Sequence, residues 1–180
     1  LHIAHISTAK SVELVRQAKK RWIKVTAEAT PHHFSLTDEV VRSFHTGTKV
    51  NPPLRAEKDV QAVKAGLSDG PIDVIVSDHA PHAVYEKDVE YKYAPLGIAG
   101  LETALSLSLN LIHEGILSIQ DLVAKLANNP AKILSLDKGI IKVGMDADIT
   151  IIDMDKEYKV DVNKFQSKDR NSPFHNWTLK

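Results

Sequence analysis

The sequence contains no cysteine, which excludes a disulfide framework and any thiolate metal site. A metal ion would therefore need histidine and carboxylate ligands, and such a set suits a hydrolytic zinc site better than a structural one. No charge of one sign predominates, because 23 basic residues balance 23 acidic ones. The charge therefore gives no reason to expect nucleic acid or an anionic membrane as a partner.

Long apolar runs are missing too. No stretch approaches the roughly 20 apolar residues of a membrane-spanning helix, and no secretory signal is visible, so we expect a cytoplasmic protein without a membrane partner. The chain also lacks an initiator methionine and begins at Leu1, inside a predicted strand. With 180 residues it can form one or two domains, and we expect it to be a fragment of a longer protein.

The first part of the chain alternates predicted strands and helices. Apolar and β-branched residues indicate strands at 1–6, 23–29 and 72–76, whereas helical spacing of apolar residues indicates helices at 9–20 and 57–67. Consecutive strand–helix units of this kind build a parallel sheet or barrel.

Two connecting segments and two further helices follow from local signals. The paired prolines predict that 49–55 is extended, and the polar composition of 83–93 predicts a surface loop. A long apolar helix is expected at 101–113 and another at 118–126, which Asn128-Asn-Pro130 would end before starting a further helix.

The pattern changes to β near residue 138. Alternating residues predict strands at 140–143, 147–153 and 158–162. We therefore expect two parts, an α/β unit at 1–137 and a small β unit at 138–180.

Polar side chains of a chemically useful kind stand where the predicted strands end. His5 closes the first strand, Glu28 lies at the end of the second, Asn51 follows in the next connection, and Asp78 ends the third, followed by His79 and His82. In a βα barrel these strand ends face one mouth. A lone Asp or His would more often be structural, but this convergence favours a functional role for His5 and Asp78.

The chemistry open to such a pair is metal-assisted hydrolysis. Imidazole and carboxylate can hold zinc, zinc lowers the pKa of bound water towards about 7, and a nearby aspartate can move the proton. For His32 and His33 a structural role is favoured, because adjacent residues of an extended segment point to opposite faces. Asn51 and Arg55 fit substrate binding and backbone hydrogen bonding equally well.

Six motifs in order along the chain resemble the bacterial-type dihydroorotases, cyclic-amide hydrolases of the amidohydrolase superfamily. They are His5-Ile-Ser-Thr-Ala, Thr26-Ala-Glu-Ala-Thr-Pro-His-His, Lys49-Val-Asn51-Pro-Pro-Leu-Arg55, Ser77-Asp78-His-Ala-Pro-His82, Gly97-Ile-Ala-Gly-Leu-Glu-Thr103 and Asn129-Pro-Ala-Lys-Ile133. Gly144-Met-Asp-Ala-Asp148-Ile and Asn171-Ser-Pro-Phe are similar to the closing β segment of that family.

The resemblance implies a fold and a set of roles. The fold would be the last βα units of a TIM-type (β/α)8 barrel followed by a small β-sandwich segment. His5 and Asp78 would be metal-site residues for one or two zinc ions, and Asp78 would also be the catalytic proton shuttle. Asn51 and His82 would bind the substrate, and the backbone of Pro95, Leu96 and Gly97 would line its ring.

The implied reaction is the reversible closure of N-carbamoyl-L-aspartate to dihydroorotate in pyrimidine biosynthesis. The first-strand histidines, the bridging ligand and the fifth-strand histidine of the family would all precede residue 1. Two alternatives stay open: a related hydantoinase, dihydropyrimidinase or allantoinase, and a non-catalytic dihydroorotase-like subunit that scaffolds aspartate transcarbamoylase. A homo-oligomer is the expected assembly.

Overall fold

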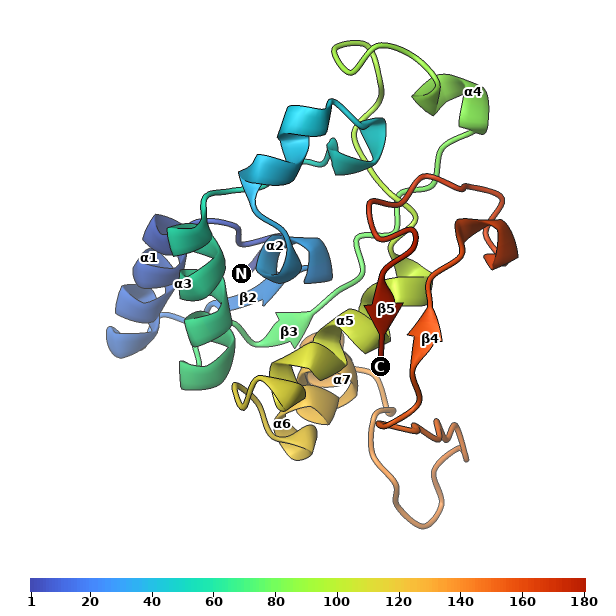
Figure 1. Cartoon of the computed structure of the whole chain (residues 1–180). Coiled ribbons are helices and arrows are strands. Elements are labelled where there is room, and N and C mark those ends of the chain that lie inside the picture. Colours follow the sequence, from blue (N-terminus) through green and yellow to red (C-terminus); the bar gives the residue numbers. More distant parts are fainter.

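A computed structural model describes all residues, Leu1–Lys180. A three-stranded parallel sheet in the order β1-β2-β3 lies at its centre, formed by β1 (His2–Ile3), β2 (Thr26–Ala29) and β3 (Val74–Ile75) (Figure 1). The predicted parallel sheet is confirmed, although each strand is shorter than expected. The outer side of β1 pairs with no strand of this chain, so the sheet has an open edge there.

Helices α1 (Ala9–Lys20) and α3 (Glu57–Asp69) follow β1 and β2 and lie side by side next to the sheet (Figure 1). The Thr8 hydroxyl caps α1 by accepting the Ser11 N–H, and the buried Val12 faces α3. A Cβ built on Gly66 of α3 would lie 2.8 Å from Val12 Cγ1, so the close approach of these helices requires glycine at that position.

The connection from β2 to α3 contains three helical segments, which are α2 (Pro31–Ser35) and the 3₁₀ helices Asp38–Ser43 and Thr46–Thr48. The capping run that begins at Ser35 predicted a short helix ending near Phe44, which is confirmed, but the other two were not predicted. The expectation that His32 and His33 lie in an extended segment is therefore wrong. Pro31 stands in the first turn of α2, where its missing N–H costs nothing, and it starts the helix instead of preventing it.

The second helical region covers the residues after β3. The predicted loop 83–93 contains the single turn α4 (Val84–Lys87), and α5 (Leu101–His113) forms as expected. Beyond it lie α6 (Ile119–Val123), a π-helical turn (Ala124–Asn128) and α7 (Asn129–Ile133).

Asn128-Asn-Pro130 starts α7 with Pro130 in its first turn, as predicted. It does not end the preceding helix, contrary to the prediction, because the backbone stays helical from α6 through α7. Pro130 has no N–H to donate, and its ring would conflict with a regular preceding turn. The wider π-helical turn lies immediately before it, which is where this conflict is relieved.

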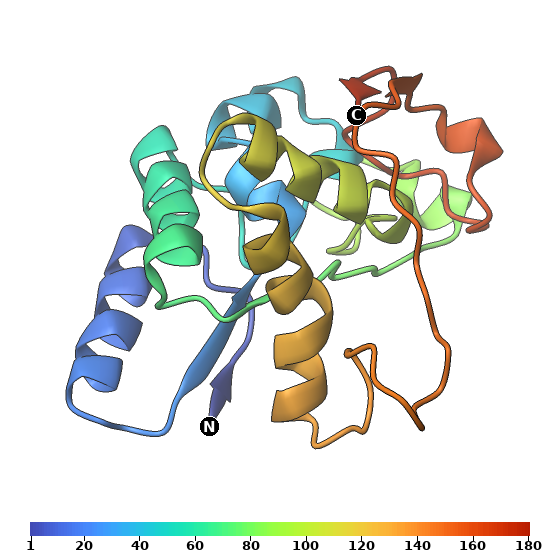
Figure 2. The ribbon, with the colours of Figure 1, turned by 90° about the horizontal axis from the view of Figure 1, so that it is seen from below.

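The C-terminal β prediction is largely wrong. Residues 140–153 contain no strand, and Ile141, Val143 and Ile151 are 89%, 100% and 94% exposed. One antiparallel pair forms, between β4 (Tyr158–Lys159) and β5 (Thr178–Leu179). The alternation of apolar and polar residues at 140–153 was not enough to form strands, since a strand also needs a partner for its backbone groups. Figure 2 shows residues 140–153 extending away from the helices without regular secondary structure.

Two apolar clusters hold the structure together. The larger one joins the sheet to the helices around it through buried residues that include Phe34, Leu67 and Ile72. The smaller one packs Phe174 and Leu179 near the C-terminus against Leu107 of α5. The C-terminal hairpin is thereby anchored on the α/β part. None of the helices has both the length and the apolar character needed to cross a membrane.

Candidate active site

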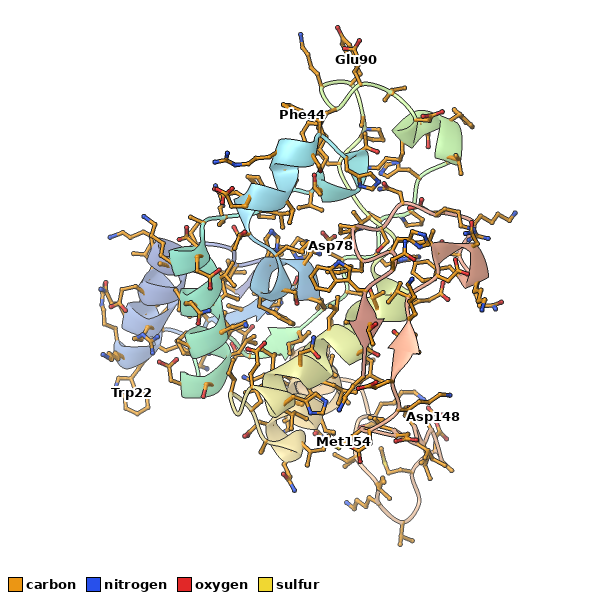
Figure 3. The ribbon with its side chains drawn as sticks, in the orientation of Figure 1. Trp22, Phe44, Asp78, Glu90, Asp148 and Met154 are labelled. Atoms are coloured by element: carbon orange, nitrogen blue, oxygen red, sulfur yellow. The ribbon has the colours of Figure 1, made fainter.

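His5 and Asp78 meet at the carboxyl edge of the parallel sheet. His5 follows β1 and Asp78 follows β3, and His5 Nε2 lies 3.6 Å from Asp78 Oδ1. Asp78 lies near the centre of the molecule (Figure 3). Both residues adopt positive φ, 52° and 46°, a conformation that costs free energy for a side chain with a Cβ. Such strain is concentrated at functional sites, where the fold holds side chains against their local preference.

Glu28 of β2 stands between two histidines, His2 of β1 and His5, which follows β1. Its Oε2 lies 2.8 Å from His2 Nε2, and its Oε1 lies 3.0 Å from His5 Nδ1, although off the line along which that ring nitrogen would donate. His2 is held on its other side by Thr26 Oγ1 at 2.8 Å. Glu28 thus lies beside one nitrogen of His5 without a hydrogen bond to it, while the other nitrogen faces Asp78. Sequence reasoning placed Glu28 at the strand end and missed both contacts.

His32 is a further member of the site that the sequence did not assign to it. Its ring is buried, and its Nε2 lies 3.9 Å from Asp78 Oδ2 without a hydrogen-bond partner. Burial, together with the neighbouring His33 and His5, lowers the pKa of His32 well below its ordinary value, so the ring is neutral. An unpaired nitrogen so deeply buried is unusual, and this one faces the carboxylate of Asp78. The helical turn of α2, absent from the prediction, puts it there.

His33 is structural, as the sequence favoured. The Pro52 carbonyl accepts its Nε2–H at 2.8 Å, and its Nδ1 lies 2.7 Å from Thr30 Oγ1. Since the first bond fixes the proton on Nε2, the Thr30 hydroxyl donates to Nδ1. Both nitrogens of the neutral ring are therefore satisfied. Burial lowers the pKa of His33 to about 4, against the opposing effect of the Pro52 carbonyl.

The electrostatic setting of Asp78 suits proton transfer. Burial raises the pKa of the Asp78 carboxyl above its ordinary value, His5 acts in the opposite direction, and Glu28 adds to the rise. A carboxylate whose pKa is shifted towards neutrality is a better general base than an exposed one.

The residues expected to bind substrate fall into two groups. His82 and the 95–97 backbone are together: the Leu96 carbonyl accepts the His82 Nε2–H at 2.9 Å, and Gly97 packs against Ala80 and His82. The backbone N–H of His82 donates to buried Asp169 at 3.2 Å.

Asn51 stands apart from the His82 group. It is exposed, its side chain makes no hydrogen bond, and it is joined by a cis peptide bond to Pro52. Pro52 accepts from His33, so Asn51 is connected to the site only through the backbone. Arg55 donates to Ser7 Oγ at 3.4 Å, close in sequence to His5.

The donor set fits part of a metal site. His5 Nε2 and Asp78 Oδ1 converge, and His32 Nε2 is buried nearby without a partner. No group of three or more histidine and carboxylate side chains surrounds a common point. Zinc usually takes four ligands, so the residues described here would supply only some of them.

Comparison with known proteins identifies the family. The model of the amidohydrolase family matches residues 2–177. The chain belongs to the amidohydrolase family. It is 55% identical over all 180 residues to a dihydroorotase of Syntrophus aciditrophicus and 56% identical to one of Citrifermentans bemidjiense. In each case it spans 42% of the length of the relative.

Solved structures of the family share this fold. An L-hydantoinase from Arthrobacter aurescens superposes with a TM-score of 0.93 and 34% identity, over 99% of this chain and 41% of its own. The amidohydrolase chain described here therefore corresponds to a segment of the superfamily's TIM-type barrel, which confirms the expected α/β class. The expected β-sandwich is not formed by the residues of this chain.

Proposed function

We propose that this chain is the C-terminal part of a dihydroorotase that interconverts N-carbamoyl-L-aspartate and dihydroorotate. The observation that carries the proposal is the meeting of His5 and Asp78 at the sheet's carboxyl edge, in a chain 55% identical to proteins named dihydroorotase. The division at residue 138 is part of the proposal. Residues 138–180 would complete a small β-sandwich only with strands from elsewhere in the full-length protein.

His5 and Asp78 would hold zinc, through the imidazole Nε2 and a carboxylate oxygen, and the other ligands would come from residues outside this chain. When bound, zinc would supply a nucleophilic water and polarise the ring amide carbonyl. Glu28 Oε1 lies 3.0 Å from His5 Nδ1, so a small rotation of the ring on ligation would let this oxygen accept the Nδ1–H and fix the tautomer and direction of the imidazole.

Asp78 would carry the proton. In ring opening its carboxylate accepts the proton of the attacking water and returns it to the ring nitrogen as the amide bond breaks. In ring closure the same carboxylate takes a proton from the ureido nitrogen. Burial raises the pKa of the Asp78 carboxyl above its ordinary value, which makes the carboxylate a stronger base for this transfer. Buried, neutral His32 lies next to the carboxylate without competing for that proton.

His82 and Asn51 would recognise the substrate carboxylate. Dihydroorotate bears a carboxylate that an unsubstituted hydantoin lacks, so these two contacts would act on one ring and not on the other. We expect His82→Ala or Asn51→Ala to raise KM for dihydroorotate by about tenfold to a hundredfold, the usual cost of one lost charge-assisted hydrogen bond. KM for unsubstituted hydantoin should change little.

Steady-state kinetics of the full-length variants on both rings test this expectation. His113→Ala, a change of an exposed histidine on α5, is the matched control and should leave both KM values unchanged. An equal rise in KM for dihydroorotate and for hydantoin would contradict recognition of the substrate carboxylate. It would favour the second candidate, a hydantoinase-type activity, which the 34% identity to the L-hydantoinase supports.

A further inference from the structure

Two lysines hold the backbone segment that follows the loop after β3. Lys49 Nζ donates to the Lys92 carbonyl at 2.8 Å and to the Ala94 carbonyl at 2.7 Å. Lys87 Nζ donates to the carbonyls of Pro95 and Gly97, each at 2.8 Å. The two ammonium groups together therefore bind four carbonyls of residues 92–97, and every acceptor belongs to the backbone.

Additional bonds complete this arrangement. The Gly97 N–H donates to the Lys49 carbonyl at 2.9 Å, and the Leu96 carbonyl accepts from His82. Gly97 has a φ of 129° and lies so close to Ala80 that an added Cβ would be 2.6 Å from that side chain. Residues 94–97 are thus fixed in one conformation against the residues that follow Asp78.

One backbone donor of this segment is left free. Pro95 has no N–H, and the N–H of Leu96 pairs with no acceptor in the protein. The Pro95 carbonyl and the Leu96 N–H belong to one trans peptide unit, so they point in opposite directions. Because Lys87 binds the Pro95 carbonyl, the Leu96 N–H points away from Lys87. Leu96 is 48% exposed. When an ammonium group binds the carbonyl of a peptide unit, it polarises that unit and makes the N–H of the same unit a stronger donor.

The burial of Lys87 argues against a merely stabilising role. Only 5% of the residue is exposed, and burial lowers the pKa of its ammonium group, while the Asp169 carboxylate opposes that effect and Lys49 adds to it. Burying a charge costs free energy that an apolar side chain would not incur, and Asp169 offsets only part of that cost because the net effect still lowers the pKa. In return, the ammonium group fixes the directions of the Pro95 and Gly97 carbonyls, which an apolar side chain could not do.

We propose that Lys87, assisted by Lys49, is a positioning residue that directs the Leu96 N–H towards the substrate and so sets substrate affinity. This inference rests on the proposed function, since it takes residues 95–97 as the substrate-lining backbone. The group recognised would be a carbonyl or carboxylate oxygen of the ring substrate. Neither lysine touches the substrate itself.

The test uses Lys87→Met and Lys49→Met in the full-length, zinc-loaded protein. We expect each to raise KM for dihydroorotate by about tenfold while kcat stays within about twofold, the pattern of lost binding without lost chemistry. Lys87→Arg, which keeps the charge, should recover part of the loss. Lys132→Met, a change of an exposed lysine on α7, is the control and should match the parent protein.

A second readout does not depend on activity. Amide hydrogen exchange at Leu96 and Gly97 in the substrate-free protein should be about tenfold faster in Lys87→Met than in the parent, with exchange in α1 and α3 unchanged. Unchanged exchange and unchanged KM would overturn the inference, and so would an equal fall in kcat. If the parent protein does not turn over dihydroorotate, the proposed function fails, and the exchange data alone then decide whether Lys87 positions this segment.

Discussion

Asp78→Asn is expected to lower the rate of ring opening by about a thousandfold or more, because general acid–base catalysis is worth about 10² to 10⁴ and the same carboxylate would also hold the metal. The amide keeps the size of the side chain and removes its ability to take a proton. Asp78 makes its close contacts with His5 and His32, so the fold should survive the change.

The measurement compares kcat/KM of the full-length protein and the variant, with the zinc content of each determined alongside. Asp155→Asn, at an exposed position of the C-terminal segment, provides a matched control and should retain full activity. Near-normal turnover by Asp78→Asn, with zinc still bound, would remove Asp78 from the mechanism.

Acid is expected to destabilise the fold through His33. Its folded pKa of about 4 lies below the ordinary value of 6.5, so the unfolded chain takes up a proton at a higher pH than the folded protein does. The stability that the neutral, buried ring provides is therefore complete above about pH 6.5 and is lost as the pH falls towards 4. From these values we expect a loss of about 2 kcal/mol between pH 7 and pH 5, and about 3 kcal/mol in full.

Denaturant unfolding at pH 7 and pH 5 measures this effect, with a chelator present so that release of metal does not contribute. His33→Gln should remove about 2 kcal/mol of the difference in the free energy of unfolding between the two pH values. His113→Gln, a change of an exposed histidine, should leave the difference as it is. A His33→Gln protein with the pH dependence of the parent would show that another group is responsible.

Local signals were sufficient wherever an element is stabilised mainly by its own residues. The spacing of Val12 and Val15 and the Thr8 cap predicted α1 at its observed bounds. The same reasoning failed at 140–153, where Ile141 and Val143 alternate with polar residues yet remain exposed. A strand depends on a partner at a distance along the chain, and alternation does not reveal whether that partner exists.

Only part of the site could be predicted, again because some of its contacts depend on structure that no local pattern reveals. The position of His5 and Asp78 at strand ends follows from the order of strands, so their convergence could be expected. His32 was missed because its position depends on the α2 turn, which begins at a proline that usually indicates an extended segment. The contacts of Lys49 and Lys87 with residues 92–97 are side chain to backbone over up to 45 residues, and no local pattern encodes them.

The most direct test is turnover of dihydroorotate by the full-length protein, with zinc supplied and then removed by a chelator, and with unsubstituted hydantoin as the competing substrate. We expect ring opening that requires zinc, returns when zinc is added back, and is faster for dihydroorotate than for hydantoin. A protein that binds zinc and does not open dihydroorotate would contradict the proposed function.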